Sequence, residues 1–197
     1  LSEVGNNHIE DNLDVIRIRR SNSLPIRWVK TIYQIVKNGR NSDLIFVNGL
    51  GVESTIAALI LKKKLIRKIV GDPVWERAYN QKKTIESFDE FQKNKHSFLI
   101  EVQKLLRNWS INSAEIVITP SDHLKNFVSE LGFNNKILKI NNGVGITDIK
   151  RTNVDKADIN LLIISRLVIQ KNINIVIEAM ELLDNKKVKL SIIGEGG

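Results

Sequence analysis

Short apolar runs alternate with amphipathic stretches along most of this chain. Residues 44–47 form an apolar run without polar alternation, which is typical of a strand covered on both faces of a parallel sheet. Similar runs predict strands at residues 15–18, 65–70, 115–119, 137–140, 161–164 and 188–193. Apolar residues at helical spacing predict helices at residues 28–37, 54–63, 98–109, 121–131 and 173–183. Strands that alternate with helices predict an α/β fold with parallel sheets.

The helix boundaries and faces can be predicted in more detail. Ser121 is expected to cap a helix that ends at Gly132, because serine favours helix starts and glycine favours helix ends. The apolar face of the helix at residues 98–109 includes Trp109, which we expect to pack in the core. In the last helix the residues expected to face inward are Ile175, Val176, Ala179, Leu182 and Leu183.

Two polar stretches interrupt the alternation. Residues 72–97 are expected to be irregular, and residues 145–158 suit a linker. The simplest architecture is therefore two α/β units, at residues 1–147 and 148–197. The chain starts at Leu1 rather than Met and stops at Gly197 inside a glycine-rich loop, so we expect a piece of a longer protein in which both units are incomplete.

Composition excludes several classes of site. Hydrophobic residues make up 42% of the chain and charged residues 26%, a normal globular balance. There is no cysteine, and the three histidines do not share helical spacing, so we expect no disulfide and no metal site. No apolar run reaches the ~18 residues that a membrane-spanning helix needs.

The formal net charge of +8 has two interpretations. It could attract phosphates of a nucleotide, a nucleic acid or an anionic lipid. Alternatively it reflects heavy use of lysine over exposed faces, and we attribute most of the charge to this.

The sharpest local feature joins a predicted buried strand to a helix, at residues 165–172. Arg166 lies at the carboxyl end of the strand, where parallel sheets bind ligands. Lys171 precedes Asn172, a plausible N-cap, so it lies at the positive end of the helix dipole, and a bound anion would relieve that conflict. Two such cations facing one crevice would suit a diphosphate. The alternative is a pair of surface charges on a loop.

A second loop, at residues 194–197, follows the last predicted strand of the same sheet. Its glycines would let a ligand approach the backbone, and the alternative is a plain turn.

These segments resemble glycosyltransferase family 4, the retaining enzymes of the GT-B fold. Residues 164–171 look like the arginine and lysine motif at the first strand of the family's donor domain, and residues 192–196 look like its Gly-acid-Gly loop. Glu178 and Ala179 lie in the following helix, as in the family. The other similar segments are residues 68–72 with 75–77, 118–121 and 140–144.

The resemblance implies two Rossmann-like domains facing a cleft. The second would bind a nucleoside-diphosphate sugar, with Arg166 and Lys171 as the catalytic cations on the diphosphate and Ser165, Gly194 and Gly196 beside it. The first would bind a saccharide or lipid-linked acceptor, and the acceptor-side candidates are Asp72, Trp75, Glu76 and Asn142. No metal or other cofactor would be required. Such an enzyme would serve cell-surface polysaccharide synthesis from the bacterial cytoplasm, and a peripheral contact with the inner membrane stays open.

The sequence departs from the family in several places. Val70 stands near the position where many members carry a histidine, and Gly145 stands where an Asp commonly follows the Asn-Gly-Val element. The family's N-terminal glycine-rich loop and its paired glutamates are not seen, so we expect this piece alone to be inactive.

Two other functions stay open. One is a different GT-B enzyme, such as a sugar-nucleotide epimerase. The other is a basic α/β module that binds nucleic acid, although the chain shows no aromatic-and-basic RNA-binding signature.

Overall fold

The computed structural model describes residues 8–10, 13–19, 21–145, 159–183 and 187–196. Two compact units emerge: Leu1–Asp72 with Ser97–Asn142, and Pro73–His96 with Gly143–Gly197. Most of the expected linker, and the expected boundary after residue 147, lie outside the described residues.

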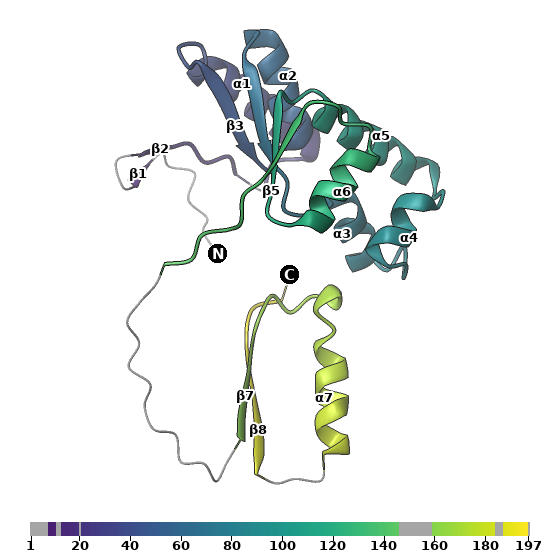
Figure 1. The fold of residues 1–197 in the computed structure, drawn as a ribbon. Coiled ribbons are helices and arrows are strands. Elements are labelled where there is room, and N and C mark those ends of the chain that lie inside the picture. Colours follow the sequence, from purple (N-terminus) through teal and green to yellow (C-terminus); the bar gives the residue numbers. More distant parts are fainter. Residues whose placement is uncertain (1–7, 11–12, 20, 146–158, 184–186, 197) are drawn as a thin grey trace. The chain divides into compact units, whose positions relative to one another are not determined.

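A four-stranded parallel sheet forms the centre of the first unit (Figure 1). Its strands are β3 (Leu44–Asn48), β4 (Lys64–Lys68), β5 (Ile116–Thr119) and β6 (Lys136–Lys139), in that spatial order. Helices α2 (Gly51–Leu61), α5 (Phe98–Asn112) and α6 (Asp122–Glu130) connect successive strands, and α1 (Leu24–Asn38) packs on α2. The predicted α/β fold with parallel strands is confirmed.

The sheet buries one face much more than the other. Val47, Leu65 and Val117 on one face are buried, whereas Phe46 on the opposite face is 56% exposed. Right-handed crossovers that advance in one direction along a sheet place their helices on the same face. The prediction that residues 44–47 are covered on both faces is therefore wrong for the described residues.

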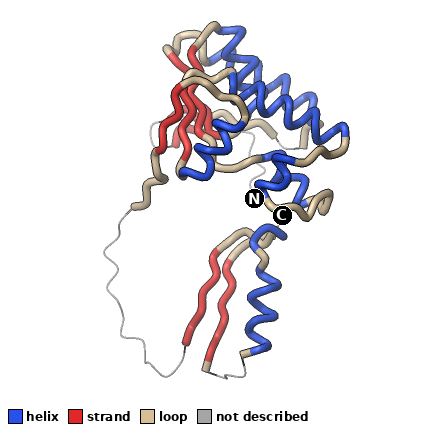
Figure 2. Tube along the Cα trace, turned by 45° about the vertical axis from the view of Figure 1, so that its right-hand side comes forward, coloured by secondary structure: helices blue, strands red, loops and turns tan. Residues whose placement is uncertain are grey.

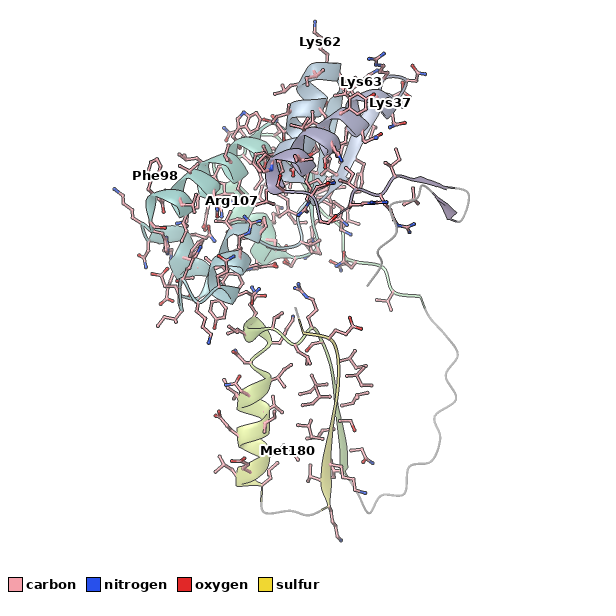
Figure 3. The ribbon with its side chains drawn as sticks, turned by 180° about the vertical axis from the view of Figure 1, so that it is seen from behind. Lys37, Lys62, Lys63, Phe98, Arg107 and Met180 are labelled. Carbon is pink, nitrogen blue, oxygen red and sulfur yellow. The ribbon has the colours of Figure 1, made fainter. Side chains whose placement is uncertain are left out.

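Helix α5 buries an unexpected face. Arg107 is only 7% exposed and lies inside the unit, whereas Phe98 is 85% exposed and projects outward (Figure 3). Trp109 is also exposed, so its predicted place in the core is wrong. The polar side is buried because Arg107 forms an ion pair with Asp72 and lies 5.3 Å from the centre of the Phe127 ring.

The stretch at residues 72–97 is not irregular as predicted. It forms α3 (Pro73–Asn80) and α4 (Phe88–Lys93). Helix α4 begins with a capping box, in which the Ser87 hydroxyl accepts from the Glu90 N–H and the Glu90 carboxylate accepts from the Ser87 N–H. This spacing of serine and glutamate is a helix-start signal, and the polar composition obscured it.

The first predicted strand is misplaced. β1 (His8–Glu10) and β2 (Leu13–Val15) form an antiparallel pair, and β2 overlaps the predicted strand at Val15 alone. Ile16 and Ile18 instead line an open groove beside α1 and β3.

The C-terminal segment contains two parallel strands, β7 (Ile159–Ile164) and β8 (Val188–Ile193), with η1 (Ile169–Lys171) and α7 (Ile173–Leu182) between them (Figure 2). None of the described residues from 159 to 196 is buried, so the prediction of a buried strand is wrong. Two strands and one helix offer too little apolar surface to enclose a core.

The face predicted for α7 is also partly wrong. The half-buried residues are Ile173, Val176 and Met180, whereas Leu182 and Ile175 are exposed. Across the described residues, no helix combines the length and apolar character needed to cross a bilayer.

Candidate functional site

The two candidate loops of the second unit lie side by side at the carboxyl ends of β7 and β8. In the parallel register Ile164 pairs with Ile193, and the Ser165 N–H donates to the Ile193 carbonyl at 3.0 Å. Further on, Leu167 forms a bridge with Gly196. Arg166 and both candidate glycines therefore belong to the same edge of the sheet, as the sequence predicts.

Gly194 has a structural reason to be glycine. A Cβ added there would lie 1.8 Å from the Ser165 carbonyl oxygen, so any side chain would force the two loops apart. At Gly196 the nearest atom to an added Cβ, the Leu167 carbonyl oxygen, would be at 3.8 Å, an ordinary contact. The proximity of the loops explains Gly194 without a ligand, in contrast to the interpretation from sequence.

Lys171 closes the short helix η1, and its N–H donates to the Val168 carbonyl at 3.0 Å. Asn172 occupies the N-cap position of α7 as predicted, but it has a left-handed backbone (φ 48°, ψ 38°) and its side chain caps nothing. A capping side chain needs an extended backbone to reach the first turn. The start of α7 therefore lacks the side-chain cap that the sequence predicts, and its first N–H groups are suited to an anion.

Arg166 is 67% exposed, and its Nη2 lies 4.0 Å from a carboxylate oxygen of Glu76, which is 39% exposed. An ion pair at that distance between exposed groups contributes little stability. Arg166 can therefore exchange Glu76 for a more highly charged ligand at small cost.

Asp72 is fully buried and forms an ion pair with Arg107 inside the first unit. Burial lowers the pKa of Arg107, and the charge of Asp72 partly opposes this shift. The pair ties the segment after β4 to α5 and leaves the Asp72 carboxylate away from the surface. Asp72 is placed to stabilise the fold rather than to contact an acceptor.

Trp75 is held by its own unit. Its indole N–H donates to the Glu86 carbonyl at 3.1 Å, and its ring contacts Tyr79 and Phe88 at centroid distances of 5.4 and 5.5 Å. Asn142 is exposed beyond β6 in the first unit. The acceptor-side candidates are therefore divided between the units, with Asp72 and Asn142 in the first and Trp75 and Glu76 in the second.

Arg67 on β4 is only 4% exposed, and the sequence did not predict this burial. Its guanidinium donates to the Gly51 carbonyl at 3.0 Å and to the Thr55 hydroxyl at 2.9 Å. Burial lowers its pKa to about 10, and the charge of Glu53 opposes the shift. Arg67 is two residues after the buried Leu65 on β4, so both side chains lie on the same face of the sheet. This alternation of faces along the strand is the signal that would have predicted the burial of Arg67.

Within the described residues no group of three His, Cys, Asp or Glu side chains is placed to hold a metal ion. The groups available to bind a ligand are cationic or N–H donors, namely Arg166, Lys171 and the backbone N–H groups at the start of α7.

A scan against protein-family models found no family that matches the chain, and a search of curated proteins found no match either.

Proposed function

We propose that this chain is part of a retaining glycosyltransferase of the two-domain GT-B type, in which Arg166 and Lys171 bind the diphosphate of a nucleoside-diphosphate sugar. The observation that carries the proposal is the parallel pairing of β7 with β8. It supports the resemblance in the sequence, because the arginine and lysine segment and the Gly-acid-Gly segment share one carboxyl edge.

The chemistry follows from where charge develops. When the bond between the sugar's anomeric carbon and the diphosphate oxygen breaks, the leaving diphosphate gains negative charge. A guanidinium, an ammonium and the N–H groups at the start of α7 stabilise that charge more in the transition state than in the ground state. The sugar then passes to a hydroxyl oxygen of a saccharide or lipid-linked acceptor, the hydroxyl proton goes to the departing diphosphate oxygen, and no metal or other cofactor takes part.

The first test is binding of uridine, guanosine and adenosine diphosphates by the chain, measured by calorimetry. The proposal expects at least one of them to bind and the matching sugar nucleotide to compete with it. No response to any nucleoside diphosphate, with tight and salt-sensitive binding of duplex DNA, would favour a basic nucleic-acid-binding module instead.

A sugar-nucleotide epimerase would share the donor site, so binding alone does not separate it from a transferase. Incubation of the proposed two-domain enzyme with the bound sugar nucleotide separates them. An epimerase converts the sugar without an acceptor, whereas the proposed transferase releases the nucleoside diphosphate only when an acceptor hydroxyl is supplied.

A further inference from the structure

Helix α5 carries an apolar stripe on its outer side. Phe98, Leu105 and Trp109 are 85%, 67% and 40% exposed, and Val102 between them is half-buried. These four residues recur at helical spacing, so they lie along one side of the helix. Phe98, at the start of this α5 stripe, projects outward from the first unit (Figure 3).

The α5 stripe is uncharged, although the chain has a formal net charge of +8. The two basic residues of the helix, Lys104 and Arg107, are each only 7% exposed. Arg107 pairs with the buried Asp72, and the Lys104 Nζ lies 3.3 Å from a Glu101 carboxylate oxygen. An anionic membrane or a nucleic acid would require exposed cations. The α5 stripe therefore suits another uncharged apolar protein surface.

The spacing of the stripe is the same in both directions along the helix. Phe98 and Val102 are separated as Leu105 and Trp109 are, so the stripe is complementary to a second, antiparallel copy of itself. A two-fold axis that relates two such helices brings Phe98 of one copy to Trp109 of the other, and Val102 to Leu105. Each aromatic residue then meets an aromatic residue, which is a favourable contact.

The residues that border the stripe agree with this orientation. In an antiparallel pair, Leu99 on one border meets Leu106 of the second copy, and these leucines are 58% and 37% exposed. On the other border Glu101 meets Asn108, an uncharged amide, so no like charges face each other. A parallel pair would instead place Glu101 against Leu106, which would bury a carboxylate against an apolar side chain.

The area of the stripe matches what a small dimer interface needs. A large apolar side chain offers about 200 Å² when fully exposed, so the exposed fractions of the five largest side chains give roughly 550 Å² on each copy. An apolar patch of this size is at the upper end of those found on monomers. Two copies would bury about 1,100 Å² in total, which is within the range of specific interfaces.

We propose that this chain forms a symmetric dimer through the outer side of α5, with the two α5 helices packed antiparallel. The inference does not depend on the proposed transferase function, because it uses only residues of α5. Burial of Lys104 and Arg107 within the unit leaves the contact surface of the helix apolar.

The test is sedimentation equilibrium of the chain over a wide range of concentrations, where the mass should rise from 22.4 kDa towards twice that value. Leu105→Glu should raise the dissociation constant of the dimer about a hundredfold or more, because each interface would bury two unpaired carboxylates. The matched control is Leu24→Glu on α1, where the leucine is 66% exposed, and it should leave the constant unchanged. A monomer at every concentration, or equal effects of the two substitutions, would overturn the inference.

Disulfide cross-linking tests the orientation, because the chain has no cysteine of its own. A mixture of Phe98→Cys and Trp109→Cys chains should form a linked dimer when oxidised glutathione is added, since the antiparallel pair brings the two positions within reach. Phe98→Cys alone should not link, because its two thiols would be about 16 Å apart along the helices. Efficient linkage of Phe98→Cys to itself would contradict the antiparallel arrangement.

Discussion

The ion pair between Asp72 and Arg107 should be a major support of the first unit. Asp72 is fully buried and Arg107 is 7% exposed, so neither charge can turn to water if the other is lost. Asp72→Asn keeps the size of the side chain and removes its charge. Stranding a buried partner typically costs about 3–5 kcal/mol, and we expect this loss in the free energy of unfolding.

Urea unfolding at neutral pH, followed by circular dichroism, measures this change. At a slope of about 2 kcal/mol per molar, the midpoint should fall by roughly 1.5–2.5 M. The matched control is Asp122→Asn, which breaks the ion pair with Lys139 at side chains that are 73% and 43% exposed. An exposed pair contributes far less, because water solvates each charge when the other is removed. Equal losses in the two variants would refute the account of the buried pair.

Two further predictions concern the second unit. Gly194→Ala should weaken the pairing of β7 with β8 by about 1–3 kcal/mol, because the added Cβ overlaps the Ser165 carbonyl. The weaker pairing should be measured as faster amide hydrogen exchange in β8. Gly196→Ala, where an added Cβ meets no close atom, should not change the exchange. Glu86 accepts hydrogen bonds from Asn94 and His96, which lower its pKa below the usual 4.5. A carboxylate whose pKa is lowered in the folded state stabilises the fold above pH 4.5, and this stability is lost on acidification. The melting temperature should therefore fall more between pH 6 and pH 3 in the native chain than in Glu86→Gln. Equal falls in the two proteins would contradict this role of Glu86.

Local signals placed most elements correctly. Ser121 caps α6 by accepting from the Leu124 N–H, and Gly132, with a φ of 79°, follows its end. Apolar runs located β3 to β8 to within a few residues. These features depend on neighbours along the chain, so the sequence carries them directly.

Long-range contacts were not predictable in this way. Helix α5 has an apolar stripe at helical spacing, yet it buries Arg107, whose partner Asp72 lies 35 positions away in the sequence. The same limit applies to Arg67 on strand β4, whose hydroxyl and carbonyl partners belong to helix α2. No periodicity in the sequence records which distant polar group will meet a charged side chain.

The candidate site was predicted in part. The sequence placed Arg166 and the glycine loop at the same edge because both follow strands of one parallel sheet, and β7 and β8 pair accordingly. It did not anticipate that Gly194 packs against the Ser165 carbonyl, or that Asn172 has a left-handed backbone. Both depend on how the two loops meet in space.

The most direct measurement for the central claim is calorimetric binding of a nucleoside diphosphate to the unaltered chain and to three variants. Arg166→Gln and Lys171→Gln should each weaken binding about tenfold, since each removes a charge-assisted contact with a phosphate. Lys187→Gln, a change just before β8 at the other end of the sheet, should bind as the unaltered chain does. Unchanged affinity in both site variants would contradict the diphosphate site and, with it, the proposed transferase.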